Sequence, residues 1–485
     1  MIRRKIMKTK IIAIIISVIL LASVLAGCSL AKNDSAAEKT TSSETSAQAE
    51  TAASANEYFT ERDLDPSYEK KDAKNIILSG DSASSDDASV KINGSSVTIT
   101  GEGVYEISGK LTDGSITVDA GESDKVQLVL SGAEITNSTG AAIYVKSADK
   151  VFITLADGTE NTLSDTGAEY KQTDGEKSID GVIFADSDLT LNGNGSLTVN
   201  AGYKHAIVSK KDLKITGGKY EITSTEKALE GENSIRICSG EFNIKAGDDA
   251  LHADEEEDKE KGYIYISGGK FTIDSGDDGI HAVTILTIDG GSFDIKAHEG
   301  LEATQVIIND GTIALNASDD GINAAQKSDQ YDPKVEINGG EITISMGQGD
   351  TDAIDSNGSI AINGGKIDIT AQFPFDYETE GKINGGEVTV NGEKVTEMTN
   401  QFGGGMFGGK EGFGKREPMT DENGETLTRP DFKNFTNENG ETMTRPERGE
   451  RPQMGDGETP PEPPTDESGN PVMPGAPAEN QQETA

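Results

Sequence analysis

Turns that recur at one place in a repeated unit hold the residues of this sequence best suited to chemistry. Aligned on the small residue that follows each turn, they are Lys204-His205-Ala206, Glu226-Lys227-Ala228, Asp248-Asp249-Ala250, Asp277-Asp278-Gly279, His298-Glu299-Gly300, Asp319-Asp320-Gly321 and Thr351-Asp352-Ala353. Three residues past the second position lie Glu230, His252, His281, Glu302, Asn323 and Asp355. If the units stack like neighbouring strands, equivalent side chains form columns with a spacing of about 4.8 Å. We call these aligned positions the acidic ladder.

Carboxylates at this spacing need a counter-charge. Two ionised groups about 4.8 Å apart repel by about 3.5 kcal/mol at an effective dielectric constant of about 20. Ca²⁺ takes about six to eight oxygen ligands, which carboxylates and turn carbonyls supply. We therefore expect calcium ligands among Asp248, Asp249, Asp277, Asp278, Glu299, Asp319, Asp320 and Asp352. The alternative is a solvated acidic face, because Asp and Asn are also ordinary turn residues.

Two further pairs of side chains are candidate ligand-binding residues. His252 and His281 stack one unit apart, so they are candidates for ligand contact, and a transition metal there is an alternative. Tyr263 and Tyr265 flank Ile264 and should both face outward, where their rings could stack on a sugar. The alternative is that the two tyrosines only cover their strand.

The elements that must position these residues form a repeat. Glycines close turns at Gly218, Gly240, Gly269, Gly291, Gly311, Gly340, Gly365 and Gly386, at intervals of 20 to 29 residues. Each unit has an alternating strand, an Asn/Asp-Gly-Gly turn, a second alternating strand, an acidic turn and a short third strand. Period-2 alternation places Ile, Val and Phe on one side of the chain. The pattern predicts an all-β solenoid.

Three short strands in 20–22 residues are typical of a parallel β-helix. Residues 76–395 have room for roughly 13 such coils. The buried side chains should form a column of core packing. It consists of Tyr220, Phe242, Phe271 and Phe293, continued by Ile313, Ile342, Ile367 and Val388.

Composition excludes several classes of protein. Asp and Glu number 85 against 43 Lys and Arg, for a formal charge of −42, and such a field repels nucleic acid. Two Cys and four His exclude a disulfide scaffold and a Cys-rich metal site.

The two ends differ from the repeat. Basic residues precede an apolar run over residues 11–26, and Leu25-Ala26-Gly27-Cys28 resembles a bacterial lipobox. We expect a lipoprotein signal peptide over 1–27, membrane lipid on Cys28, and an extracytoplasmic protein anchored to the bacterial cell membrane. Residues 28–57 read as a disordered tether and residues 396–485 as a Gly/Pro-rich disordered tail.

Several stretches resemble a known family. They are Gly103 to Gly109, Asp124 to Leu130, Ala148 to Leu155, Gly158 to Leu163 and Asp188 to Gly193. Together they resemble the carbohydrate-binding domain family of lipoproteins from anaerobic, mostly clostridial bacteria, over residues 58–395. The resemblance implies a right-handed parallel β-helix similar to pectate lyases, bound Ca²⁺, and binding of plant-wall polysaccharide, notably acidic pectic chains. The family's Asp-Gly pairs are absent near Lys204-His205 and Lys227-Ala228, so no cation is expected there.

Three functions remain open at this stage. The first is a surface lipoprotein that binds acidic pectic chains, or cellulose, through a calcium-loaded ladder, since bound Ca²⁺ reverses the local sign of the field. The second is a calcium-dependent polysaccharide lyase acting by β-elimination on polygalacturonate, for which Lys227 is the available base. The third is an adhesin or scaffold without a sugar ligand.

Overall fold

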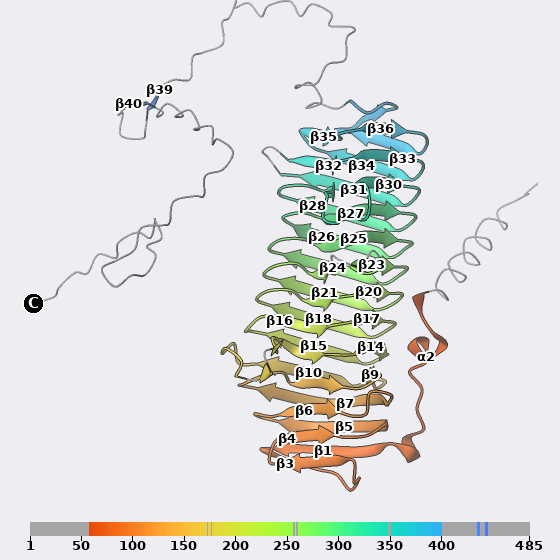
Figure 1. The fold of residues 1–485 in the computed structure, drawn as a ribbon. Helices are drawn as coiled ribbons and strands as arrows, with labels where there is room; N and C mark the ends of the chain where they lie inside the picture. Colours follow the sequence, from red (N-terminus) through yellow and green to blue (C-terminus); the bar gives the residue numbers. More distant parts are fainter. Residues whose placement is uncertain are drawn as a thin grey trace, which may run out of the picture. The chain divides into compact units, whose positions relative to one another are not determined.

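The computed structural model is built almost entirely of β-strands (Figure 1). It describes residues 58–171, 173–175, 177–255, 258, 260–347 and 351–399, and two short strands further on. The chain divides into two units after Gly405. In the second unit, β39 (Asn434–Thr436) and β40 (Thr442–Thr444) pair antiparallel, where no strand was expected. The predictions for residues 1–57, including Cys28, and for the rest of the tail lie outside the described residues.

The strands of the first unit stack in three parallel columns, because most strands pair with the third strand after them (Figure 1). The first column is β1 (Lys74–Gly80), β5 (Gly103–Leu111), β7 (Lys125–Asn137), β9 (Lys150–Leu155), β14 (Asp188–Gly193), β17 (Asp212–Ile215), β20 (Ser234–Ile237), β23 (Tyr263–Ile266), the second halves of β25 (Ile280–Ile288) and β27 (Leu301–Ile308), β30 (Lys334–Ile337), β33 (Ser359–Ile362) and β36 (Glu380–Ile383).

The second column carries the alternating strands of the repeat. It contains β10 (Glu160–Asp165), β15 (Ser196–Ala201), β18 (Lys219–Ser224), β21 (Glu241–Ala246), β24 (Lys270–Ser275), β26 (Ser292–Ala297), β28 (Thr312–Ala317), β31 (Glu341–Met346), β34 (Lys366–Thr370) and β37 (Glu387–Val390). The third column contains β4 (Ser96–Ile99), β6 (Ser115–Asp119), β8 (Ile143–Ser147), β13 (Gly181–Ala185), β16 (His205–Ser209), β19 (Leu229–Gly231), β22 (Leu251–Ala253), the first halves of β25 and β27, β29 (Ile322–Ala324), β32 (Asp352–Ser356) and β35 (Phe373–Phe375).

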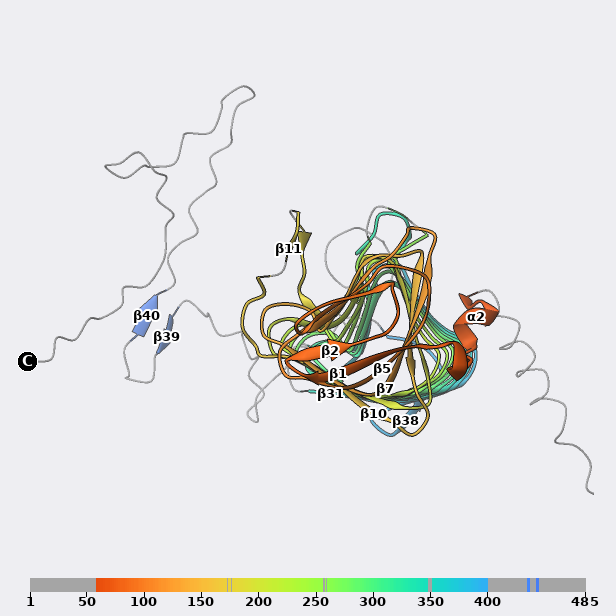
Figure 2. The ribbon, with the colours of Figure 1, turned by 90° about the horizontal axis from the view of Figure 1, so that it is seen from below.

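The core lies between the three columns, which enclose a common interior (Figure 2). Strands of the second column alternate between buried and exposed residues, as in β21 and β26. The rings of Phe242, Phe271 and Phe293 stack with centroids 4.6 and 4.7 Å apart and planes within 2°. The predicted core column from Tyr220 to Val388 is confirmed in register, because each member pairs with the next.

The turns between the first and second columns depend on glycine and asparagine. Gly269 has a φ of +112°, and a Cβ there would lie 3.0 Å from the ring of Phe271, so a side chain would meet both backbone strain and the core. Before the glycines, the side-chain amides of Asn338, Asn363 and Asn384 each donate to the Oδ1 of the preceding coil's asparagine at 2.8 Å. The asparagine side chains of the predicted Gly-Gly turns therefore hydrogen-bond to one another from each coil to the next.

Antiparallel hairpins close the first unit at both ends. β3 (Val90–Asn93) pairs with β4, β2 (Ser82–Ser84) pairs with β1, and β38 (Glu393–Val395) pairs with β37. Hairpins at the ends shield the unpaired edges that a parallel stack would expose. A further short hairpin, β11 (Thr173–Asp174) and β12 (Lys177–Ser178), lies in the loop before β13 (Figure 2).

Residues 58–66, which we call the N-terminal latch, lie outside the three columns against the first one (Figures 1 and 2). They include the helix α2 (Glu61–Leu64), whose Thr60 and Asp63 form a capping box, and a 3₁₀ turn follows at Lys70–Asp72. The sequence placed residues 58–395 in the β-helix, but strands begin only at Lys74. In the part of the chain that the structure describes, no helix is long and apolar enough to span a membrane.

Candidate functional site

The acidic ladder lies on the third column, at the turn where the chain enters each strand. Backbone amides of the small residues donate to the carbonyl of the ladder residue in the next coil. Ala228 donates to Asp249, Ala250 to Asp278, Gly279 to Glu299, Gly300 to Asp320 and Gly321 to Asp352, at 2.8–3.1 Å. The predicted alignment of the turns is therefore confirmed, and Lys227 occupies the same position one coil before Asp249.

A second file of side chains runs beside the first along the strands. The pairing brings Glu230, His252, His281, Glu302, Asn323 and Asp355 into one register, as the sequence predicted. The two files face the same side, since His252 contacts Asp249 and His281 contacts Asp278. The ladder is therefore two side chains wide.

The two acidic residues of a ladder turn differ in their exposure to solvent. Asp249 and Asp278 are each only 4% exposed, and Glu302 is 3% exposed. Asp277 is exposed and Asp248 and Asp319 are partly exposed. The candidate ligands Asp249 and Asp278 thus carry charge into a low-dielectric environment, whereas their partners remain in contact with solvent.

Burial and mutual repulsion raise the pKa of several ladder carboxyls. Burial, with Asp249 and Glu299 nearby, raises the pKa of Asp278 to about 8. Burial raises the pKa of Glu299 to about 7, with repulsion from Glu302 added. Burial, with repulsion from Asp355 and Glu299, raises the pKa of Asp320 to about 7. These values indicate more negative charge than the surrounding protein compensates.

The centre of the ladder pairs histidines with carboxylates. His252 Nδ1 lies 2.5 Å from Asp249 Oδ2, and His281 Nδ1 lies 2.7 Å from Asp278 Oδ2. His281 Nδ1 also lies 3.2 Å from Glu302 Oε2. Burial acts to raise the pKa of Asp249, but the hydrogen bond and charge of His252 outweigh it and hold that pKa below its usual value.

The later part of the ladder offers mainly oxygen and amide groups, together with the exposed imidazole of His298 beside Glu299 and Asp319. Asn323 Nδ2 donates to Glu299 at 2.9 Å and to Glu302 at 3.2 Å. The Oδ1 of Asn323 is buried and has no hydrogen-bond partner, and the residue as a whole is only 8% exposed. A buried acceptor in this state needs a donor or a cation. Asp320 Oδ1 accepts from the Asp352 amide at 3.1 Å.

The first coils of the ladder are neutralised by the protein itself. Lys210 Nζ lies 2.9 Å from Glu230 Oε1, and His205 Nε2 lies 3.4 Å from Glu226. Burial opposes ionisation of Glu230, but Lys210 and His205 lower its pKa overall.

Lys227, the base of the lyase alternative, is half-buried. Its backbone amide donates to His205 Nδ1 at 3.3 Å.

The structure corrects the prediction for one of the two tyrosines. Tyr265 is 1% exposed, because Tyr58 of the latch stacks on its ring at a centroid distance of 3.7 Å. A sugar cannot reach that face of Tyr265 while the latch is in place. Tyr263 is partly buried, with the Arg236 guanidinium carbon 5.2 Å from its ring centroid, so its role remains a prediction.

Sequence reasoning missed several members of the site. Glu302, Asn323 and Asp355 were aligned with the ladder but not assigned as ligands, although the same alignment carried that signal. Lys327 Nζ lies 2.7 Å from Glu302 Oε1. It comes from a loop between coils, where the repeat gives no signal.

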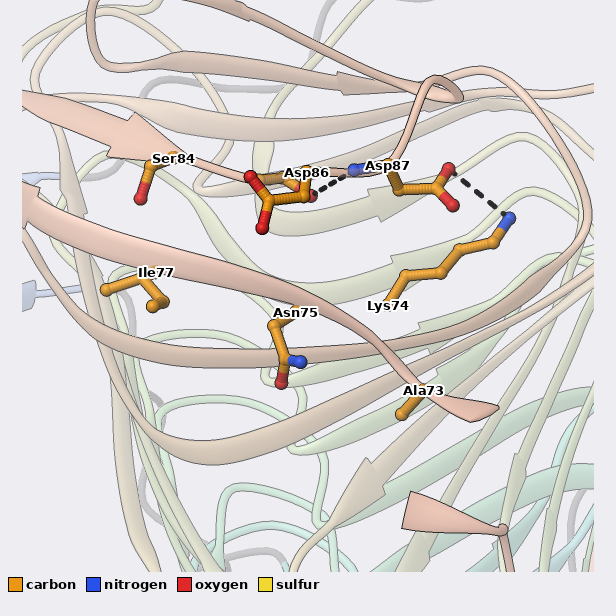
Figure 3. A pocket seen from close by; sticks show the side chains of 8 residues that line it. Ala73, Lys74, Asn75, Ile77, Ser84, Asp86 and Asp87 are labelled. Atoms are coloured by element: carbon orange, nitrogen blue, oxygen red, sulfur yellow. Dashed lines mark hydrogen bonds and ion pairs between the residues drawn. The ribbon is translucent and has the colours of Figure 1, made fainter. Parts of the chain in front are cut away.

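A separate pocket lies near the N-terminal hairpins, away from the ladder (Figure 3). It is lined by residues of β1, β2 and the loop after β2, and Lys74 Nζ lies 3.6 Å from Asp87 Oδ1 at its edge. This ion pair joins two of the charged residues of the pocket, and no ladder residue lines it.

Several known proteins are similar to parts of this chain. A solved structure, titled as the polysaccharide lyase-like protein from C. thermocellum in a gadolinium derivative, is 28% identical. It covers 64% of this chain and all of its own, with a TM-score of 0.44. A relative from Acetivibrio thermocellus, described as a carbohydrate-binding domain-containing protein, is 39% identical over 148 residues. That match is 30% of this chain and 52% of the relative, so the chain spans about half of the relative's length. The family described as carbohydrate-binding domain-containing protein matches residues 93–353 and 300–401, and the chain belongs to that family.

Proposed function

We propose that this protein is an extracytoplasmic lipoprotein that binds acidic plant-wall polysaccharide through Ca²⁺ on the ladder. Membership of a carbohydrate-binding family supports the sugar as ligand. Acidic pectic chains are the proposed ligand and cellulose the second. The observation that carries the calcium proposal is the surplus of buried acid around Asn323, whose Oδ1 has no partner.

The residues around Asn323 have the ligand chemistry that calcium requires. Glu299, Asp320, Asp352 and Asp355 offer carboxylate oxygens, and Asn323 adds an amide oxygen. Hard oxygen donors of this kind are the ligands that Ca²⁺ prefers. A bound Ca²⁺ would supply positive charge to a uronate carboxylate, which a chain with a formal charge of −42 otherwise repels. The ladder carboxylates would hold the ion, and their raised pKa values would fall when it binds.

The finer description of the fold is also a proposal. We infer that the three stacked columns form a right-handed parallel β-helix of about 13 coils. The pairing of most strands with the third strand after them supports a winding of this kind.

Calcium titration of one ladder variant tests the proposal. Asp320→Asn keeps the turn geometry, since Asn also suits turns, but removes one charge beside Asn323. We expect its calcium affinity to fall by at least about tenfold and its binding to polygalacturonate to weaken in parallel. Asp294→Asn is the matched control, because Asp294 is exposed on β26 outside the ladder. Equal calorimetric titrations for wild type, control and Asp320→Asn would refute the calcium ladder.

A lyase is the second candidate, because Lys227 lies in the same file as Asp249 and Asp278. β-Elimination requires a base near the metal and leaves an unsaturated uronate. Incubation with polygalacturonate and Ca²⁺ should then produce ultraviolet absorbance that Lys227→Met abolishes. Binding without such absorbance supports the binding protein, and binding of neither ion nor sugar supports an adhesin or scaffold.

A further inference from the structure

The centre of the ladder differs chemically from the part assigned to calcium. Here the two histidines of β22 and β25 lie side by side, with ring centroids 4.7 Å apart. One ligand atom each of Asp249, His252 and His281 lies within 4.8 Å of the other two. The same holds for Asp278, His281 and Glu302, so His281 belongs to both groups. Nitrogen and oxygen donors therefore converge from two neighbouring coils.

The charges in this cluster are unequal. Asp249, Asp278 and Glu302 contribute three carboxylates, and Lys327 is the lysine that contacts them, 2.7 Å from Glu302. Three carboxylates and one ammonium group have a formal charge of minus two when all four are ionised. One divalent cation would neutralise that charge. All three carboxylates are 96% or more buried, so solvent compensates little of it.

Imidazole nitrogen distinguishes between metals. Ca²⁺ takes oxygen ligands, whereas Zn²⁺ and its first-row neighbours bind imidazole well. Ligand atoms of tetrahedral Zn²⁺, at about 2.0–2.1 Å from the ion, lie about 3.3 Å from one another. His281 Nδ1 is already 2.7 Å from Asp278 Oδ2 and 3.2 Å from Glu302 Oε2. Small side-chain rotations would bring the donors to this spacing.

We infer that Asp249, His252, Asp278 and His281 form a binding site for a first-row transition metal, with Zn²⁺ as the typical ion. Glu302, held by Lys327, lies beside the site. The ladder would then hold two kinds of metal along one surface: a mixed nitrogen and oxygen site at its centre, and Ca²⁺ at the carboxylate and amide oxygens around Asn323. This inference does not depend on sugar binding.

Titration of the chelator-stripped protein with Co²⁺ and Zn²⁺, each alone, tests the site. Co²⁺ bound by imidazole and few ligands gives visible absorption that the aqueous ion lacks, and Zn²⁺ should displace it. We expect one such site in the wild type. His281→Asn and His252→Asn should each lower Zn²⁺ affinity by at least about tenfold.

Two controls separate this site from the rest of the ladder. Asp294→Asn removes an exposed carboxylate of β26 outside the ladder and outside every candidate ligand group, and Zn²⁺ affinity should stay unchanged. Asp320→Asn should affect Ca²⁺ but not Zn²⁺, so the calcium proposal can fail while this one stands. Absence of the Co²⁺ absorption in folded wild type would overturn the inference without any variant. So would Zn²⁺ binding of equal strength in wild type and His281→Asn.

Discussion

At the residue scale, the ladder holds carboxyl groups that are unfavourable when ionised. The pKa of Asp278 is about 8, because burial and the charges of Asp249 and Glu299 oppose its ionisation. An unfolded Asp titrates near pH 4. Between these two values the native state therefore binds the proton more tightly than the unfolded state, and this contribution to stability is lost as pH rises.

This linkage gives a prediction for the metal-free protein. With chelator present, the melting temperature should fall as pH rises from about 5 to about 8. Asp278→Asn should raise the melting temperature at about pH 8 by a few degrees and make the pH dependence shallower. Some slope should remain, because Glu299 and Asp320 have pKa values of about 7. Calorimetric scans of wild type, Asp278→Asn and the exposed control Asp294→Asn measure this. A stability that rises with pH over this range would contradict it.

A single core position gives the second prediction. Phe271 is 1% exposed and stacks between Phe242 and Phe293. Phe271→Ala should lower the free energy of unfolding by about 3–5 kcal/mol, because it leaves a cavity in the stack. Thr272→Ala, on the exposed face of the same strand, should change it by less than about 0.5 kcal/mol. Similar denaturation midpoints for both variants would mean that the stack does not hold the coils together.

At the element scale, the N-terminal latch is held by a buried charge network. Asp63 is fully buried and pairs with Lys150, and its other carboxylate oxygen lies 3.4 Å from Lys214 Nζ. Thr190 also donates to Asp63, at 2.9 Å. These contacts join α2 to three consecutive coils, β9, β14 and β17. Burial opposes ionisation, but the bond from Lys150 and the charges of both lysines hold the pKa of Asp63 well below its usual range.

Removal of this carboxylate should release the latch. Asp63→Ala should lower the free energy of unfolding by about 3–5 kcal/mol, because it leaves two buried lysines unpaired. Wild-type stability from this network is present above about pH 4 and is lost as pH falls further, since the folded pKa is lowered. Limited proteolysis should cut residues 58–66 faster in Asp63→Ala. The nearby exposed variant Glu61→Ala is the control, and equal cleavage rates would show that the latch is held by other contacts.

The elements also show what the sequence could predict. The core column and the ladder register follow from period-2 alternation and a repeat of about 21 residues, because stacking carries each position to the next coil. The docking of the latch has no such signal, since the lysine partners of Asp63 lie 87 and 151 residues away in the chain. The latch also explains the error at Tyr265. Period-2 alternation predicted that the ring faces away from the core toward solvent, but Tyr58 of the latch covers it. The sequence shows that His281 follows Asp278 by three residues. The contact between their side chains, however, depends on the path of the backbone from the turn into the strand.

At the scale of the whole molecule, negative charge governs which ligands can approach. The chain carries a formal charge of −42, yet basic groups gather under the latch, where Lys150 and Lys214 contact Asp63. The third column bears the ladder with its surplus of acid. An anionic polymer would therefore meet attraction only where bound cations supply it. Sugar binding should accordingly depend on Ca²⁺.

The proposed lipid anchor gives the last prediction. If Leu25-Ala26-Gly27-Cys28 is a lipobox, the thiol of Cys28 receives the lipid and Cys28→Ser prevents attachment. The variant should leave the membrane fraction of the producing bacterium and lose incorporation of labelled lipid. Mass spectrometry of the N-terminus must accompany the fractionation, because an uncleaved apolar run would also retain the protein on membranes. The ladder begins at Lys204, 176 residues after Cys28, so the released variant should bind Ca²⁺ and polygalacturonate as the wild type does. Unchanged lipid labelling in Cys28→Ser would refute the anchor. If Cys28→Ser lost calcium binding as well as the anchor, calcium binding would depend on the lipid anchor.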